Sequence, residues 1–210
     1  MVVMDIGAEY GEYTADITRT IPINGKFTKV QREIYQAVLD ANKAAIAMVA
    51  PGVGYQEVMN AGTEKVKEGL FRLGLITDIE SRWQYRVWLT HGIGHWLGLV
   101  VHDVGDYRRQ DEKGRVLEPG MVFTMEPGIY IQDDILDNLK DMRMIRASDE
   151  EIDTFVEKVK PVAAQYTNIG VRIEDDVLVT EDGYKVLSQK APKEIRDVEK
   201  LMAKKSYLNQ

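Results

Sequence analysis

Apolar, β-branched runs predict strands in three parts of the chain. Residues 1–23 contain two such runs separated by a turn that includes Gly11, a pattern typical of a β-hairpin. Shorter apolar runs at about residues 121–131 and 171–180 predict further strands, and an acidic stretch separates these two runs. We therefore expect a hairpin at the start of the chain and a second strand region in its later half.

Two helices are predicted directly after the hairpin. Thr28 and Gln31 form a capping-box pair at the start of the first helix, and apolar residues then recur every three or four positions until Pro51 ends it. The second helix covers about residues 55–73. It ends at Gly74, because glycine readily adopts the left-handed conformation that closes a helix.

Two more helices are predicted towards the end of the chain. Ser148 and Glu151 form another capping-box pair ahead of an apolar, helically spaced run. The last helix, residues 192–207, is amphipathic. Its expected inward-facing residues are Ile195, Val198, Leu201 and Met202. Strands and helices in this order predict an α+β fold, and we find no internal repeat.

The composition narrows the classes of partner. With 210 residues, of which 44% are hydrophobic, the chain can bury one good core. The absence of cysteine removes thiolate metal sites and fits a reducing compartment, so we expect a cytoplasmic protein. A net charge of −7 argues against binding to nucleic acid, and no apolar stretch is long enough to span a membrane.

All three histidines of the chain lie within residues 91–102, among glycines and large apolar side chains. Gly92 and Gly94 each disfavour a helix by about 1 kcal/mol relative to alanine, so we expect a loop or a strand. The glycines would let the backbone approach a ligand closely. A lone histidine in such surroundings would be a structural core residue, but three together favour a functional site.

Two aspartates of the hairpin are expected to face each other. If the hairpin turns on Tyr10 and Gly11, Asp5 and Asp16 lie directly across the two strands. Facing carboxylates destabilise a sheet unless a cation lies between them or water covers the face. The alternative is that both aspartates lie on a solvated hairpin edge.

Two glutamates interrupt predicted strands, and buried carboxylates need partners. Glu126 has a structural alternative as a strand-end residue before Pro127, and Glu174 has one as the ion-pair partner of Arg172. Together with the aspartates and an imidazole they form an oxygen-rich donor set. Such sets hold two divalent ions about 3.5–4 Å apart and activate water, which predicts hydrolysis. The donors favour Mn²⁺, with Zn²⁺ or Co²⁺ as alternatives.

The segments that carry these residues resemble the catalytic half of the Xaa-Pro aminopeptidases, or aminopeptidases P, within the pita-bread metallopeptidases of M24 type. The resemblance runs in order from residue 1 to about residue 190, and it implies a pita-bread fold. Its motifs are DIGAEYGEYTADITRTIPINGKF, HGIGHWLGLVVHDVG, LEPGMVFTMEPGIYI and GVRIEDDVLVT.

The resemblance implies a dinuclear metal centre. Asp5 would bind one ion, and His95 and Glu126 would bind the other. Asp16 and Glu174 would bridge both ions, and a metal-bridging hydroxide would be the nucleophile. The substrate implied is a peptide with proline at its second position, which is cut after its N-terminal residue.

The resemblance also implies roles around the metal centre. Glu126 would transfer a proton, while His91 and His102 would contact the substrate and stabilise the tetrahedral intermediate. Arg172 and Tyr130 would contact the substrate or orient the ligands.

The spacing of the histidines separates two branches of the family. Methionine aminopeptidases carry an HGIG whose histidine is a ligand and is followed by a second histidine seven residues later. Here Gly98 lies seven residues after His91, whereas His102 lies seven residues after His95. This spacing indicates that His95 is the ligand and that the chain belongs to the proline-directed branch.

One alternative within the family stays open, and a second is disfavoured by the residues. Prolidases, which cut Xaa-Pro dipeptides, share the same ligands, although the wording HWLGLVVHDVG favours aminopeptidase P. Non-catalytic pita-bread modules, which bind peptides, replace one or more ligand positions. All five ligand positions are kept here, which favours an enzyme.

Two features depart from the family pattern. Val100 stands where the family commonly has an acidic residue, two positions before His102. Family members also carry an N-terminal domain and a further segment ahead of the first aspartate. We therefore expect residues 1–210 to be a single, truncated C-terminal catalytic domain, with an insertion at about residues 133–166. Expected partners are the missing N-terminal half and, in the full-length form, further copies in a homo-oligomer.

Overall fold

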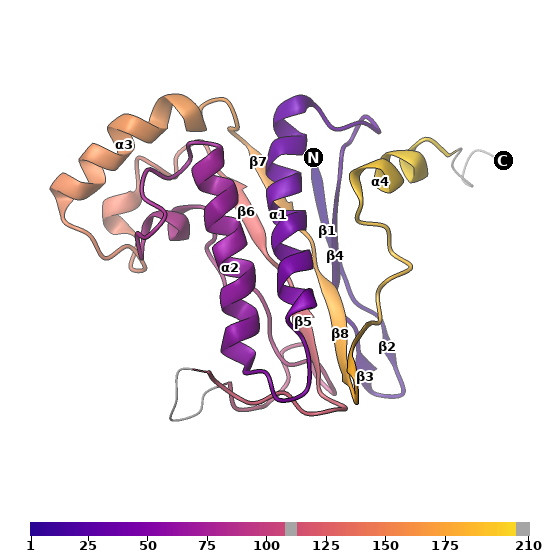
Figure 1. The fold of residues 1–210 in the computed structure, drawn as a ribbon. Helices are drawn as coiled ribbons and strands as arrows, with labels where there is room; N and C mark the ends of the chain where they lie inside the picture. Colours follow the sequence, from indigo (N-terminus) through magenta and orange to yellow (C-terminus); the bar gives the residue numbers. More distant parts are fainter. Residues whose placement is uncertain (108–112, 205–210) are drawn as a thin grey trace.

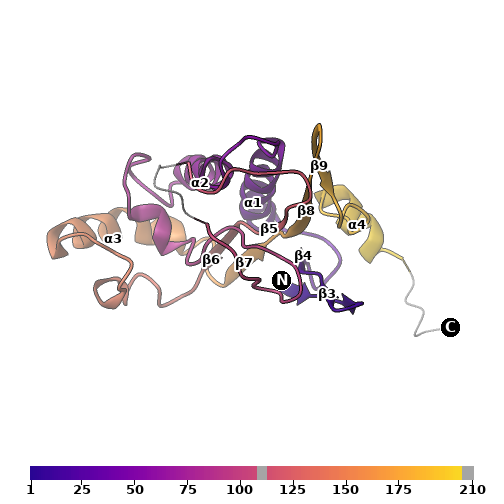
Figure 2. The same cartoon turned by 90° about the horizontal axis from the view of Figure 1, so that it is seen from below.

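The computed structural model describes residues 1–107 and 113–204 of the chain. Helices α1 and α2 lie side by side and cover one face of strands β5–β8, as Figures 1 and 2 show. In chain order the elements are β1 (Val2–Ile6), β2 (Glu9–Tyr10), β3 (Tyr13–Thr14), β4 (Ile17–Ile21), α1 (Lys29–Ala47), α2 (Tyr55–Arg72), the 3-10 turn η1 (Gln84–Val87), β5 (Val122–Met125), β6 (Gly128–Ile131), the 3-10 turn η2 (Leu139–Asp141), α3 (Asp149–Ala163), β7 (Ile169–Arg172), β8 (Asp175–Thr180), β9 (Gly183–Val186) and α4 (Ile195–Met202). This mixture confirms the predicted α+β class.

The predicted starts of α1 and α3 and the predicted end of α2 rest on local signals and are confirmed, whereas α1 ends at Ala47, ahead of the predicted end at Pro51. The capping box of Thr28 and Gln31 is formed at the start of α1, and that of Ser148 and Glu151 at the start of α3. Helix α2 ends before Gly74, whose φ of +74° is the left-handed conformation expected there.

The last helix is shorter than predicted. Helix α4 covers Ile195–Met202, and residues 205–207 of the predicted helix lie outside the described part of the chain. Val198 is buried as expected, but Leu201 is 48% exposed, so its prediction as an inward-facing residue was wrong. Within the part of the chain that the structure describes, no helix has the length and hydrophobicity needed to cross a bilayer.

The hairpin turns one position later than predicted. The turn residues are Gly11 and Glu12, with φ of +59° and +70°, and Tyr10 pairs with Tyr13. Two consecutive positive φ angles match the twist of a tight hairpin, in which glycine costs nothing and glutamate is strained. Because Glu12 is not a residue that typically favours this conformation, the sequence pattern indicated the wrong turn position.

The later turn changes which residue lies opposite Asp5. Strands β1 and β4 are antiparallel, and Asp5 pairs with Thr18 rather than with Asp16. Asp16 lies two residues before Thr18. Since side chains alternate between the two faces with a period of two, a shift by two residues keeps Asp16 on the same face, diagonal to Asp5. The predicted pairing was wrong, but the two carboxylates still approach each other.

The later strands form two ladders that share one register. Strand β5 pairs antiparallel with β8, and β6 pairs antiparallel with β7. The interruption between the ladders contains Pro127, which has no N–H to donate. The shared register places Glu126 opposite Glu174 across this interruption. The flanking pairs are Met125 with Asp175 and Gly128 with Arg172.

One hydrophobic core joins the helices to the strands. Strands β5–β8 contribute side chains that α1 and α2 cover, and α3 adds Phe155 at one end. Strand β9 also pairs with β8, but it was not predicted because its residues are mostly exposed and lack apolar alternation. Among the largest fully buried side chains are Trp88, Tyr35, Phe123 and Phe155.

Candidate metal centre

His95 is held in a loop that packs directly against β5. Its backbone N–H donates to the Thr124 hydroxyl at 3.1 Å, and the Thr124 N–H donates to the His95 carbonyl at 2.8 Å. A Cβ on Gly94 would lie only 2.4 Å from the Thr124 carbonyl oxygen, so the glycine permits this close approach. Residues 91–102 form a loop, one of the two predicted possibilities, and the close approach at Gly94 is to the backbone of β5. The predicted approach of the glycines to a ligand stays a prediction.

The imidazole of His95 presents one free nitrogen to the centre of the cluster. Its Nδ1 donates to the Trp96 carbonyl oxygen at 3.1 Å, which fixes the proton on Nδ1 and leaves the Nε2 lone pair available. Burial lowers the pKa of His95 and so favours its neutral form. A neutral imidazole held in one tautomer is the form that binds a metal ion.

Three carboxylates surround this nitrogen. His95 Nε2 lies 3.4 Å from Asp16 Oδ2, 3.4 Å from Glu126 Oε1 and 4.0 Å from Glu174 Oε1. The aspartate comes from the hairpin, and the glutamates come from the interruption between the two ladders. These separations leave room for a cation between the donors.

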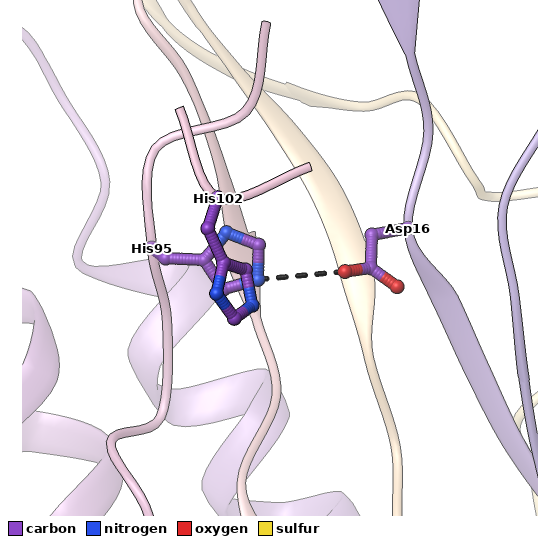
Figure 3. Close-up of side chains that lie close together, drawn as sticks. All are labelled: Asp16, His95 and His102. Carbon is purple, nitrogen blue, oxygen red and sulfur yellow. Dashed lines mark ion pairs between the residues drawn. The ribbon is translucent and has the colours of Figure 1, made fainter. Parts of the chain in front are cut away.

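His102 lies over the ring of His95. The two ring centroids are 4.2 Å apart, and Figure 3 shows both imidazoles beside Asp16. Among the described residues, three groups have donor atoms that all lie within 4.8 Å of one another. The groups are Asp16 with His95 and His102, His95 with Glu126 and Glu174, and Asp5 with Asp16 and Glu174.

Thr18 and Arg172 hold two of the carboxylates in place. The Thr18 hydroxyl donates to Glu174 Oε2 at 2.5 Å, and Arg172 Nε donates to Thr18 Oγ1 at 3.1 Å. Arg172 also forms a short ion pair with Asp5. Among the described residues, Arg172 therefore pairs with Asp5, and the alternative pairing with Glu174 is wrong.

Asp176 orients the backbone of Asp16. The Asp16 N–H donates to both carboxylate oxygens of Asp176, each at 3.3 Å. Burial raises the pKa of Asp176 to about 7. Asp176 and Thr18 could not be recognised as site residues from the sequence, since each contacts a ligand residue more than 150 positions away along the chain.

One buried oxygen of the cluster has no protein partner. Glu174 is 1% exposed, and its Oε1 accepts no hydrogen bond within the described part of the chain. A buried, unpaired carboxylate oxygen is costly unless an ion or a water satisfies it. This oxygen faces His95 Nε2, so the cluster fits a divalent cation by its donors and by its unmet need for one.

The carboxylates also titrate at unusually high pH. Burial, followed by the neighbouring Asp5 carboxyl group, raises the pKa of Asp16 to about 6. Burial raises the pKa of Glu126 to about 7 and that of Glu174 to about 8, and nearby carboxylates add to both increases. Carboxylates that are buried close together repel each other, so their protonated forms are favoured. A bound cation favours their charged forms instead.

His91 lies beside the cluster and contacts Tyr130. Its Nδ1 donates to the Gly92 carbonyl oxygen at 2.6 Å, so its Nε2 accepts from the Tyr130 hydroxyl at 2.9 Å. His91 Nδ1 lies 3.6 Å from Glu126 Oε2, on the side of that carboxylate away from His95. Burial lowers the pKa of His91, which favours a neutral ring.

The structure thus gathers the residues selected from the sequence. The five predicted ligands form one connected group, and the four other predicted site residues surround it. The ligands are Asp5, Asp16, His95, Glu126 and Glu174, and the others are His91, His102, Tyr130 and Arg172. Their chemical roles stay predictions.

Comparison with known proteins identifies the family. The model of metallopeptidase family M24 matches residues 1–181, which is most of the chain and includes every residue of the cluster. The chain belongs to this family. Membership implies divalent metal ions at the site, although the comparison does not say which metal.

Relatives and solved structures place the M24 chain near one group of enzymes. It is 44% identical to the Xaa-Pro aminopeptidase of Haemophilus influenzae, over 96% of this chain and 42% of that protein. It is 39% identical to the Xaa-Pro aminopeptidase of Escherichia coli, over 96% of this chain and 41% of that protein. The chain spans about two-fifths of the length of these curated relatives.

Solved structures show the fold of this M24 chain. The structure of Pseudomonas aeruginosa aminopeptidase PepP matches with a TM-score of 0.78 at 42% identity, over 96% of this chain and 41% of that one. Proline aminopeptidase P II from Yersinia pestis matches with a TM-score of 0.76 at 39% identity, over 96% and 41% respectively. The predicted pita-bread fold of aminopeptidase P is therefore confirmed.

Proposed function

We propose that this chain is the catalytic part of an Xaa-Pro aminopeptidase, which hydrolyses the bond between an N-terminal residue and a following proline. The observation that carries the proposal is the convergence of three carboxylates on His95 Nε2, at 3.4–4.0 Å. The names of the relatives support the substrate class. The proposal concerns an activity that those relatives have as longer proteins.

The site is proposed to hold two divalent cations, preferably Mn²⁺, with Zn²⁺ or Co²⁺ as alternatives. Asp5 would bind one ion, and His95 and Glu126 would bind the other, in keeping with their separate donor groups. Asp16 and Glu174 each occur in a donor group with His95 and in a group with Asp5, which suits them to bridge both ions. When bound, such a pair of cations supplies Lewis acidity that lowers the pKa of water and polarises a carbonyl group.

Glu126 is the residue we assign to proton transfer. Its Oε1 faces His95 at 3.4 Å, and its Oε2 faces His91 at 3.6 Å, so the two oxygens have different neighbours. One oxygen can remain a ligand while the other accepts a proton and later donates it to the leaving amine. A carboxylate placed this close to the reacting groups acts as a general base and then as a general acid.

His91 and His102 are assigned to substrate contact. Burial lowers the pKa of His91 and so favours its neutral form, and Nδ1 donates to the Gly92 carbonyl oxygen while Nε2 accepts from Tyr130. His102 lies in an exposed loop over His95, where an incoming peptide can reach it. Tyr130 is proposed to orient His91, and Arg172 to orient Asp5 through their ion pair.

Further proposals concern the domain, its location, its oligomeric form and the length of its substrate. We infer that residues 1–210 form one catalytic domain, into which residues 133–166 are inserted as η2 and α3. We also propose a cytoplasmic location and a homo-oligomeric full-length form. The proposed substrate is a peptide longer than a dipeptide. The prolidase activity shares the ligand set, so the length of the substrate decides between the two activities.

The test compares peptides of different length. The full chain is incubated with Mn²⁺ and either Gly-Pro-Ala or Gly-Pro, and the products are identified by mass spectrometry. We expect glycine and Pro-Ala from the tripeptide, loss of cleavage with a chelator and recovery after Mn²⁺ is restored. Cleavage of the dipeptide alone would indicate a prolidase. Metal binding without cleavage of either peptide would contradict catalysis by this chain alone, and cleavage that survives exhaustive chelation would contradict a metallopeptidase.

A further inference from the structure

A second polar cluster lies directly behind the ligands, on the opposite side of the strands. Glu174 and Asp175 are consecutive, so their side chains point to opposite faces. Glu174 faces the candidate metal centre, whereas Asp175 is fully buried and faces away from it. We define the network as the side chains of Arg19, Asn42, Asp175 and Lys193.

Asp175 is neutralised by two cationic side chains. Arg19 Nη2 lies 2.7 Å from Asp175 Oδ1, and Lys193 Nζ lies 2.6 Å from Asp175 Oδ2. The Ser188 hydroxyl donates to Oδ1 at 2.6 Å. A buried carboxylate with two cations and a hydroxyl is fully paired, so it is rigid and costly to disturb.

Arg19 binds the backbone of a predicted ligand. Its Nη1 donates to the Glu174 carbonyl oxygen at 2.5 Å and to the Thr18 carbonyl oxygen at 2.8 Å. Its Nε and Nη2 donate to the Ala191 carbonyl oxygen at 3.2 and 2.9 Å. The planar guanidinium therefore fixes the carbonyl of Glu174 relative to β4, which carries Thr18 and directly follows Asp16.

Asn42 extends the network to the second glutamate. Lys193 Nζ donates to Asn42 Oδ1 at 2.6 Å. Asn42 Nδ2 donates to the carbonyl oxygens of Met125 at 3.0 Å and Ile173 at 3.3 Å. Met125 precedes Glu126 and Ile173 precedes Glu174, so one amide group holds the backbone immediately before both glutamates.

The network lies where the sheet itself gives least support. The ladder of β5 with β8 and that of β6 with β7 are interrupted around Pro127, which the shared register places opposite Ile173. The Pro127 carbonyl oxygen accepts from the Ile173 N–H at 3.3 Å, but proline has no N–H to donate in return. Asn42 on α1 donates to the carbonyl oxygens of Met125 and Ile173, and Arg19 on β4 donates to that of Glu174. Lys193, before α4, holds Asn42 and Asp175 instead. Both predicted glutamate ligands leave the backbone at this interruption.

We propose that Arg19, Asn42, Asp175 and Lys193 are positioning residues. They hold the metal ligands in place and so set metal affinity without contacting the metal themselves. This inference rests on the proposed metal centre. Groups that hold ligands in place typically change metal affinity about 10- to 100-fold when removed. The network acts on Glu126 and Glu174 together, since it binds the backbone beside each of them.

The test uses the full chain and compares metal binding with stability. Mn²⁺ affinity is measured by calorimetry, and stability of the metal-free chain by urea unfolding, for Asp175→Asn and for Lys193→Gln. Lys193 is partly exposed, so its variant is expected to fold even if the other does not. The matched control is Gln84→Ala, which removes a buried amide that accepts from Thr77 and Asp78, away from the ligand strands.

We expect Mn²⁺ affinity to fall about 10- to 100-fold in the two network variants, and the absorption bands of bound Co²⁺ to change. The control is expected to lose stability while it keeps wild-type affinity and the wild-type Co²⁺ spectrum. Wild-type affinity and spectrum in Lys193→Gln would overturn the positioning role, whatever its stability. Failure of the wild type itself to bind Mn²⁺ or Co²⁺ would overturn the proposed function, and this inference with it.

Discussion

Glu126 and Glu174 lie opposite each other where two strand ladders are interrupted, and both approach His95 Nε2, at 3.4 and 4.0 Å. Two facing carboxylates in a buried sheet repel each other unless a cation lies between them. The sheet is interrupted at this level by Pro127, which frees the backbone to turn both side chains towards the histidine. This opposition is the structural basis of the candidate metal centre.

The close packing of the histidine loop on β5 predicts a difference between two glycines. A Cβ on Gly94 would lie 2.4 Å from the Thr124 carbonyl oxygen, whereas one on Gly92 would meet no atom within 4 Å. Gly94→Ala should lower the free energy of unfolding by about 1–3 kcal/mol and weaken metal binding, because His95 must shift. Gly92→Ala should change stability by less than about 0.5 kcal/mol. Urea unfolding and calorimetry check both, and equal effects would show that the close approach is absent.

The raised pKa values of the carboxylates predict how the metal-free chain responds to pH. Glu126 and Asp176, with pKa near 7, and Glu174, with pKa near 8, hold protons that the unfolded chain has already lost. Stability from these groups is therefore lost as the pH rises through their folded pKa values. The lowered pKa values of His91 and His95 act in the opposite direction, but only below about pH 6.5.

We therefore expect the free energy of unfolding of the metal-free chain to fall between about pH 6.5 and 8.5. Urea unfolding in the presence of a chelator measures this slope. Glu174→Gln, which cannot lose a proton, should show a shallower slope than the wild type. A free energy that stays constant or rises over this range would contradict the assignment of buried, protonated carboxylates.

The Thr18 hydroxyl is expected to orient Glu174. A valine at this position removes the hydroxyl without changing the size of the side chain. Thr18→Val leaves Glu174 Oε2 without its 2.5 Å hydrogen bond and Arg172 Nε without its acceptor. We expect Mn²⁺ affinity to fall about tenfold or more. Thr18→Ser keeps the hydroxyl and should retain most of the affinity. Calorimetry of the two variants checks this, and equal affinities would mean that the hydroxyl does not orient Glu174.

Removal of the Tyr130 hydroxyl is expected to lower the turnover number without lowering the metal content of the chain. Tyr130→Phe removes the hydroxyl that donates to His91 Nε2 at 2.9 Å, so His91 loses its orientation towards the substrate. We expect kcat for a Gly-Pro-Ala peptide to fall about 10- to 100-fold with unchanged Mn²⁺ content. The control is Tyr166→Phe, which removes a tyrosine hydroxyl bonded to Glu33 instead. Similar kcat values for the two variants would remove Tyr130 from the site.

Local signals in the sequence were enough to predict most of the helices. The capping boxes at Thr28 and Ser148 and the glycine at Gly74 act through neighbours three or four residues away, so a short window contains all of the information. The hairpin turn was misplaced because Glu12 adopts a positive φ that few glutamates adopt. Asp16 nevertheless stayed beside Asp5, because a shift of two residues preserves the face.

The ligands could be selected from the sequence, but the groups that hold them could not. Carboxylates and histidines in apolar surroundings are conspicuous in a sequence, since burial without a partner is costly. Thr18, Arg19 and Asn42 are ordinary residues in a strand and a helix, and their partners lie far away along the chain. Only the tertiary structure shows that they meet the backbone and side chains of the glutamates.

Five side chains are proposed to bind a pair of divalent cations, and the number of metal ions retained per chain tests this proposal. The full chain is reconstituted with Mn²⁺, freed of unbound metal and analysed for metal per chain by element-resolved mass spectrometry. We expect two ions per wild-type chain, and at most one in His95→Ala and in Asp5→Asn, because these residues occur in different donor groups and are proposed to bind different ions. A wild-type chain that retains no Mn²⁺, or that retains as much as a variant lacking all five side chains, would contradict the account.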